Sequence, residues 1–169
     1  YNFATGTPLA GNVIGTDADG LLDRGNAASG VTIHNSSGNT VGGAGGGAGN
    51  IISGNGRDGV YIVLAGANNV QGNLIGVDAT GNVGMGNDRV GVRVVSSAGN
   101  QIGGAGAAGN TISDHLMHGV VVFGAASTGN KIEGNRIGTN VAGTADLGND
   151  LHGVFLAAAG KFDQAIADY

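Results

Sequence analysis

The stretch Gly91-Val92-Arg93-Val94 carries the pattern that decides the fold: a glycine, an apolar residue, a variable residue and a second apolar residue. This four-residue step recurs along the chain, and its starting points are Gly30, Gly59, Gly91, Gly119 and Gly153. Successive steps are 29, 32, 28 and 34 residues apart, which indicates a repeating unit of about 30 residues. Alternation over so few positions is typical of a short strand with one buried face.

Two longer strings show that each unit contains more than one strand. Gly11-Asn12-Val13-Ile14-Gly15-Thr16-Asp17 returns in similar form at 72–78, 61 residues on, and at 134–140, 62 further. Asn39-Thr40-Val41-Gly42-Gly43 returns at 100–104. Each unit thus holds one Gly-Val-x-apolar and two Asn-x-apolar segments, and Gly or Asn interrupts nearly every window in which a helix would form. Stacking of equivalent segments about 4.8 Å apart predicts three parallel sheets around a Val/Ile core, an all-β parallel β-helix of about five coils.

Composition agrees with a single repetitive domain over residues 1–169. The 169 residues include 37 Gly and 18 Asn, and 41% are hydrophobic, which excludes collagen and argues against a disordered chain. The net charge of −5 disfavours a nucleic-acid partner, and no apolar run approaches the roughly 20 residues of a membrane span, so we expect neither nucleic-acid binding nor membrane insertion. Without cysteine there is no disulfide or thiolate metal site.

Asparagines fall into three columns when the units are aligned. The columns are Asn39, Asn68, Asn100 and Asn130; Asn12, Asn50, Asn73, Asn110 and Asn135; and Asn26, Asn55, Asn87 and Asn149. Stacked amides can hydrogen-bond along a column, and Asn tolerates the left-handed backbone of a tight corner. We therefore predict that these side chains form ladders or corners and are not merely part of solvated loops.

An outward column is expected to lie between the inward Val and Ile positions. It contains Thr32, Tyr61, Arg93, Val121 and Phe155. The corner before each Gly-Val step is rich in charge and histidine, which is also what a merely solvated corner would show. The candidate ligand-binding residues on this face and its edge are Tyr61, Arg93, Phe155, Arg57, Arg89, His118 and His152.

The phrases G-N-x-I-G-T-D at 11–17, N-x-I-G-G at 100–104 and G-N-x-I-S-G-N at 49–55 resemble the repeats of a known family. They are similar to the right-handed parallel β-helix repeats, with the pectin lyase-like fold, of large secreted or surface bacterial proteins. The resemblance covers roughly residues 11–156 and implies a right-handed β-helix that is secreted or on the cell surface.

Two functions are compatible with that resemblance. The first is a non-catalytic module for structural extension, adhesion or glycan binding, with a polysaccharide or cell-surface glycan as partner and with end-to-end stacking or flanking domains. The alternative is a polysaccharide-active enzyme, a lyase, glycoside hydrolase or epimerase, or a fragment of one. The resembled enzymes bind polysaccharide along an outer sheet face, where aromatic residues, carboxylates and Arg are used.

Four residues are the catalytic candidates of the enzyme alternative: Asp114, His115, Asp58 and Asp88. Hydrolysis needs two carboxylates at a fixed separation, yet Asp58 and Asp88 stand at different offsets from the following Gly. Signatures expected of the resembled enzymes, such as Asn-Thr-Asp and Gly-His-Gly, are missing. The sequence therefore favours the non-catalytic function.

A metal site and a terminal cap complete the expectations. Asp17, Asp19 and Asp23 surround Gly20 with the spacing of a Ca²⁺ loop, so Ca²⁺ is the one cofactor considered, against a plain loop. The tail at 157–169 leaves the repeat. Its Phe162, Ile166 and Tyr169 recur at helical spacing and predict a short helix capping the core, with vector-derived sequence as the alternative.

Overall fold

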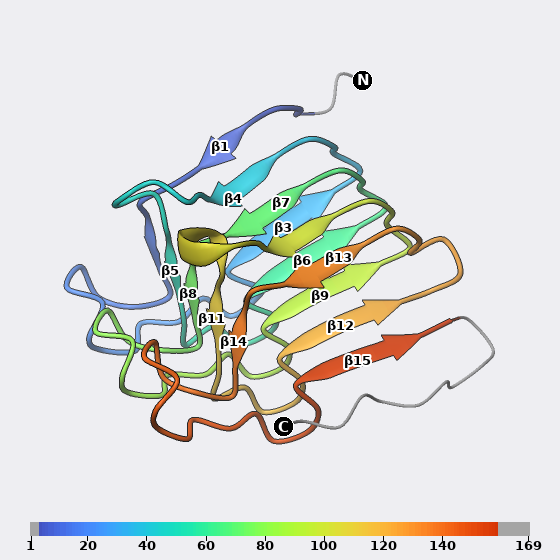
Figure 1. The fold of residues 1–169 in the computed structure, drawn as a ribbon. Helices are drawn as coiled ribbons and strands as arrows, with labels where there is room; N and C mark the ends of the chain where they lie inside the picture. Colours follow the sequence, from blue (N-terminus) through green and yellow to red (C-terminus); the bar gives the residue numbers. More distant parts are fainter. Residues whose placement is uncertain (1–3, 159–169) are drawn as a thin grey trace.

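The computed structural model describes residues 4–158 and folds them into three five-stranded sheets (Figure 1). Sheet 1 contains β1 (Pro8–Leu9), β4 (Thr40–Gly42), β7 (Asn69–Gln71), β10 (Gln101–Gly103) and β13 (Lys131–Glu133). Sheet 2 contains β2 (Val13–Ile14), β5 (Ile51–Ile52), β8 (Leu74–Ile75), β11 (Thr111–Ile112) and β14 (Arg136–Ile137). Sheet 3 contains β3 (Val31–His34), β6 (Val60–Val63), β9 (Val92–Val95), β12 (Val120–Phe123) and β15 (Val154–Ala157).

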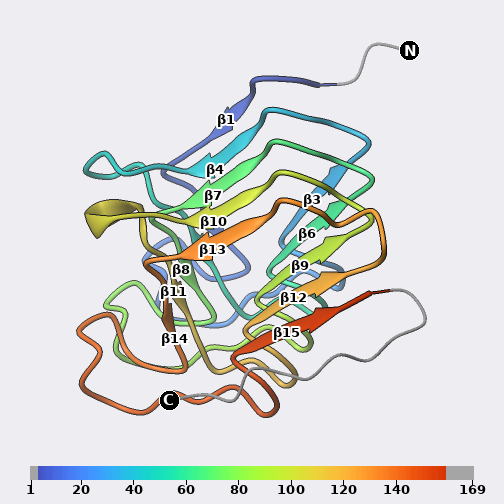
Figure 2. The same ribbon diagram turned by 45° about the vertical axis from the view of Figure 1, so that its right-hand side comes forward.

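Each strand pairs in parallel with its equivalent one coil away, so the chain climbs through five coils. Coil 1 holds β1 to β3, coil 2 holds β4 to β6, coil 3 holds β7 to β9, coil 4 holds β10 to β12 and coil 5 holds β13 to β15. Figures 1 and 2 show the strands of each sheet stacked in this order. The predicted parallel β-helix with a unit of about 30 residues is confirmed.

Two details at the ends extend the sequence analysis. Strand β1 lies before residue 11, where the repeats were expected to begin. It was not predicted, because Thr7 stands where the other coils have Asn. The predicted cap, with its residues 159–169, lies outside the described residues. Within 4–158 the helical element is η1 (Gly106–Ala108), a single 3₁₀ turn.

The core consists of the inward columns of the three sheets. In sheet 3 the predicted register is confirmed: the expected inward residues all belong to one hydrophobic cluster, in which Val31 is partly buried and the others are buried. Those residues are Val31, Ile33, Val60, Ile62, Val92, Val94, Val120 and Val122. Each fully buried Val or Ile stabilises the fold by roughly 1.5–3 kcal/mol relative to exposure.

The asparagine columns form hydrogen-bonded ladders, as predicted. A typical rung is Asn50, whose backbone N–H and side-chain Nδ2 both donate to Oδ1 of Asn73, at 3.0 and 2.9 Å. The same arrangement joins Asn39 to Asn68 and onward through the other rungs of both columns. The amides in the middle of these ladders are buried and hydrogen-bonded, so they tie each coil to the next without leaving a buried amide unpaired.

Corner lengths alternate along the helix, which explains why the clearest sequence repeat is about twice one coil. Between sheets 2 and 3, coils 1, 3 and 5 have long corners, at 15–30, 76–91 and 138–153, whereas coils 2 and 4 have short ones. The long corners stack on one another across two coils: the N–H of Ala79 donates to the carbonyl of Gly20, and that of Val141 to Gly81, at 2.9 and 2.8 Å.

Candidate functional site

The outer face of sheet 3 carries the predicted outward column in register. Thr32 lies beside Tyr61, Tyr61 beside Arg93, Arg93 beside Val121 and Val121 beside Phe155. A second outward column runs parallel to it through His34, Val63, Val95, Phe123 and Ala157. The face is therefore mostly apolar and aromatic, with Arg93 at its centre.

The last five residues of each corner between sheets 2 and 3 form one edge of this face. These aligned segments end in the Gly of the Gly-Val step and are 26–30, 55–59, 87–91, 115–119 and 149–153, and corner positions are counted within them. The third corner position places Arg57 next to Arg89, whose N–H donates to the Arg57 carbonyl at 3.3 Å. The fourth position contains Asp58, His118 and His152. The structure thus brings the predicted ligand-binding residues to one face and its edge.

Arg93 links the upper half of the site, in coils 2 and 3. Its guanidinium lies over the Tyr61 ring, 5.4 Å from the centroid, and its Nη1 is 3.8 Å from Oδ2 of Asp58. Asp58 is buried, and its Oδ1 accepts a hydrogen bond from the Val90 N–H at 3.3 Å. Burial raises the pKa of the Asp58 carboxyl, while the positive charges of Arg93, Arg89 and Arg57 act in the opposite direction.

Three stacked rings form the lower half of the site, in coils 4 and 5. The His118 ring lies 5.2 Å from that of His152 and 5.1 Å from that of Phe155, at interplanar angles of 20° and 21°. The N–H of His152 donates to Nδ1 of His118 at 3.1 Å. Burial, and then the charge of His152, lower the pKa of His118, so this imidazole is neutral at neutral pH and its Nδ1 is an acceptor.

A small cavity of about 180 Å³ joins the two halves. Its lining combines guanidinium and imidazole groups with apolar side chains: Arg89, Arg93, His118, Val121, Phe123 and Phe155 contribute to it. A group bound there would contact flat apolar surface on one side and hydrogen-bond donors on the other, which is how pockets orient sugars and carboxylates.

His115 lies inside the molecule, where it replaces an asparagine in the third ladder. The N–H of Asn87 donates to Nδ1 of His115 at 3.1 Å, and the N–H of His115 donates to Oδ1 of Asn149 at 3.2 Å. The side chain is fully buried, so it cannot contact a substrate on the outer face. The sequence analysis missed this role because it searched the column for Asn alone, although His115 stands at the right spacing.

The two remaining catalytic candidates, Asp114 and Asp88, lie in different surroundings. Oδ2 of Asp114 accepts the N–H of Gly86 at 2.9 Å, beneath the corner of coil 3. Asp88 is exposed on that corner. Of the four candidates, Asp58 is the one whose carboxyl group lies against the aromatic and Arg side chains of the outer face.

The aspartates considered for Ca²⁺ lie in the first long corner, where two of them bond to backbone. Oδ1 of Asp17 accepts the N–H groups of Leu21 and Leu22, at 2.8 and 3.0 Å, and these bonds lower its pKa. Oδ1 of Asp23 accepts the Gly25 N–H at 2.8 Å, and Asp19 is exposed. In residues 4–158 no group of three or more carboxylate or imidazole side chains is placed to hold a metal ion.

The equivalent residues of the other long corners act in the same way. Oδ1 of Asp78 accepts the N–H groups of Asn82 and Val83, both at 3.1 Å. Oδ1 of Asn140 accepts those of Thr144 and Ala145, at 2.9 and 3.2 Å. The amide of Asn140 accepts the same backbone hydrogen bonds as the carboxylates of Asp17 and Asp78. The geometry that the three corners share is therefore that of a turn.

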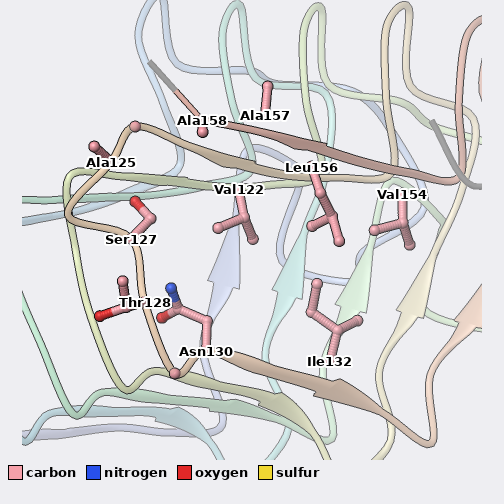
Figure 3. A pocket seen from close by; sticks show the side chains of 12 residues that line it. Val122, Ala125, Ser127, Thr128, Asn130, Ile132, Val154, Leu156, Ala157 and Ala158 are labelled. Atoms are coloured by element: carbon pink, nitrogen blue, oxygen red, sulfur yellow. The ribbon is translucent and has the colours of Figure 1, made fainter. Parts of the chain in front are cut away.

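A cavity of about 640 Å³ lies at the coil 5 end of the core (Figure 3). The inward side chains Val122, Ile132, Val154 and Leu156 point into it, and Ser127, Thr128 and Asn130 line its rim. No charged side chain lines it. Strand β15 is the last strand of the described residues, and the cavity lies at that end of the core, apart from the outer-face site.

Comparisons of the chain with models of protein families, with curated proteins and with solved structures find no match. Within residues 4–158 there is also no helix of the length and apolarity that a membrane crossing requires.

Proposed function

We propose that this chain is a non-catalytic β-helix module, of the pectin lyase-like kind found in secreted or surface bacterial proteins, that binds glycan on the outer face of sheet 3. One observation carries the proposal: Tyr61 and Arg93, together with the rings of His118, His152 and Phe155, lie on one face and its edge. Flat apolar rings pack against sugar rings, while a fixed guanidinium donates to hydroxyl or carboxylate oxygens.

The strands that carry these side chains hold them in fixed positions, which supports glycan binding. Tyr61, Arg93 and Phe155 stand on strands of a parallel sheet and are therefore spaced by the sheet and not by a loop. Arg93 contacts Tyr61 and Asp58, and Phe155 stacks on His118 and His152; these contacts further restrict the side-chain rotamers. Binding to such a face costs less conformational entropy than binding that first has to order a loop.

Local charge favours a glycan that carries carboxylates, although the whole chain has a net charge of −5. The positive charges of Arg57, Arg89 and Arg93 all act on the single carboxyl group of Asp58. In coils 2 and 3, Arg57, Arg89 and Arg93 outnumber the two carboxyl groups of the same edge, Asp58 and Asp88, which leaves a local excess of one positive charge there. We therefore expect a uronic-acid oligosaccharide to bind more tightly than a neutral one.

A polysaccharide-active enzyme is the second candidate, and the raised pKa of Asp58 is the observation that favours it. A raised pKa is the direction that a general acid in glycoside cleavage requires, because such a carboxyl group keeps its proton to a higher pH than usual. An assay for reducing ends and unsaturated uronates, run on wild type and on Asp58→Asn, separates this candidate from the binder. Product formed by wild type and lost in Asp58→Asn would establish the enzyme.

Calorimetric titration with a neutral and a uronic-acid oligosaccharide tests the binding proposal. We expect wild type to bind the uronic-acid chain, and Arg93→Ala and Tyr61→Ala to lose on the order of tenfold or more in affinity. Arg136→Ala is the matched control, because Arg136 is an exposed arginine on sheet 2. Equal binding, or none, by all four proteins would overturn the proposal.

A further inference from the structure

Coil 4 is tied to both of its neighbours through imidazole nitrogens that act as acceptors. On one side, Nδ1 of His115 accepts the N–H of Asn87, from coil 3, at 3.1 Å. On the other, Nδ1 of His118 accepts the N–H of His152, from coil 5, at 3.1 Å. At the rungs above Asn87, the same bond goes to an amide oxygen, which cannot be protonated in ordinary acid.

The interior around His115 offers no charge to compensate a proton. A Cβ on Gly76 or Gly91 would lie within 2.8 Å of the ring, so the chain passes the imidazole closely on both sides. The group that hydrogen-bonds the ring, the Asn87 N–H, is uncharged, and so are Ile112, which lies beside Gly91, and Asn149, which accepts the His115 backbone N–H. Nε2 has no hydrogen-bond partner within the described residues. The nearby carboxylate of Asp114 is directed to the Gly86 N–H.

The surroundings of His118 are unfavourable to a proton for a different reason. His152 and Phe155 stack on its ring, and Arg89 and Arg93 share its cavity. The Asp58 carboxyl group is paired with Arg93. A protonated His118 would therefore face two guanidinium groups and, in acid, a second imidazolium.

We propose that coil 4 is an acid-sensitive joint: protonation of Nδ1 of His115 removes a hydrogen bond to coil 3, protonation of Nδ1 of His118 removes one to coil 5, and coils 3, 4 and 5 loosen from one another. This joint does not depend on the glycan proposal, although it would separate the two halves of the outer-face site, because Tyr61 and Arg93 lie in coils 2 and 3 and Phe155 in coil 5.

The direction of the effect follows from linkage. Burial lowers the pKa of His115 from 6.5 to about 4, against the smaller opposite effects of the Asn87 and Ile75 backbone, and burial also lowers that of His118. At neutral pH both rings are neutral acceptors. Between pH 6.5, the ordinary histidine value that applies in the open state, and about pH 4, the His115 value in the closed state, the open state binds more protons than the closed state. The joint therefore weakens as the pH falls through this range.

Amide hydrogen exchange, resolved residue by residue at neutral pH and at about pH 4, tests this joint. The Asn87 amide of wild type should lose protection on the order of a hundredfold, and that of His115→Asn should lose far less, because asparagine restores the amide rung. The Asn50 amide, bonded to Asn73 in the second ladder, should keep its protection. His34→Asn, which removes an exposed histidine from coil 1, should behave as wild type.

Two outcomes would overturn the proposal. One is an equal loss of protection at Asn87 in wild type and in His115→Asn; the other is an equal loss at Asn50 and Asn87 in wild type, which would indicate general acid unfolding. If His115→Asn does not fold, an NMR titration of the His115 ring in wild type decides the matter. A pKa at the ordinary histidine value would contradict a buried, neutral acceptor.

Discussion

The two faces of sheet 3 are built on the same five strands in the same register, yet their residues vary to different degrees. The inward positions of β3, β6, β9 and β12, in coils 1 to 4, are all Val or Ile, and those of β15 are Val154 and Leu156. The outward column changes from Thr to Tyr, Arg, Val and Phe. Inside, each side chain must pack on nearly identical neighbours one coil away, whereas an outward side chain extends toward solvent and need not match the residue on the next coil. Repetition therefore stabilises the helix, and variation is confined to the face for which we propose glycan binding.

The same substitution on opposite faces of β9 gives the sharpest test of this comparison. Val92→Asp places an unpaired carboxylate in the core and should lower the free energy of unfolding by roughly 3–5 kcal/mol. Val95→Asp, on the outward face of the same strand, should cost less than about 1 kcal/mol. Urea unfolding of both proteins measures the difference, and similar midpoints would refute the assigned register.

Acidification tests the one buried position of the third ladder at which a histidine, His115, replaces an asparagine. Its pKa of about 4 lies below the unfolded value of 6.5, so its contribution to stability is complete above 6.5 and is lost as the pH falls toward 4. The free energy of unfolding should drop by up to about 3 kcal/mol over that range. His115→Asn should flatten this part of the pH profile, and an unchanged slope in the variant would assign the loss to other groups.

Asparagine rungs should differ according to their depth in the ladder. Oδ1 of the buried Asn110 accepts the N–H and Nδ2 of Asn73, and its Nδ2 donates to the Val70 carbonyl at 2.8 Å. Asn110→Ala should therefore cost about 1–3 kcal/mol, because it leaves these partners buried and unpaired. Asn12→Ala, at the exposed end of the same ladder, should cost less than about 0.5 kcal/mol. Equal melting temperatures for both variants and wild type would show that the ladder is not stabilising.

The smallest effect on stability is expected on the outer face. Tyr61→Ala removes a cation–π contact and partly buried ring area, and it should lower stability by about 1 kcal/mol or less. Its effect on glycan affinity should exceed its effect on stability. Thermal unfolding and calorimetric titration of the same sample compare the two effects. A large loss of stability would assign Tyr61 a structural role in place of the proposed role in glycan binding.

Features that depend on repetition could be predicted from the sequence, because every coil repeats the same information. The inward register of Val92 and Val94, the amide columns and the outward row with Arg93 all follow from spacing. Contacts between unlike residues could not be predicted. That Arg93 lies over Tyr61 and beside Asp58 depends on side-chain rotamers in adjacent coils, which no repeated pattern specifies.

His115 shows a different limit of the sequence analysis. An Asp-His pair in a corner is a plausible catalytic remnant as long as only residue types are considered. The ladder assigns it otherwise, because Nδ1 of an imidazole can occupy the acceptor place of an amide oxygen. Alignment by position in the corner, and not by residue identity, would have found this role.

The alternation of corner lengths makes the two-coil step the natural increment of this architecture. The long corners at 15–30, 76–91 and 138–153 bond to each other across an intervening coil with a short corner. One extra coil with a short corner, inserted between coils 3 and 5, would move their long corners one further strand spacing apart, about 4.8 Å, so that the Val141 N–H could no longer reach the Gly81 carbonyl. Two extra coils, spliced in as 61 or 62 residues, would keep every corner opposite its counterpart. An engineered extension of this β-helix should therefore add two coils at a time, which lengthens it by roughly 10 Å.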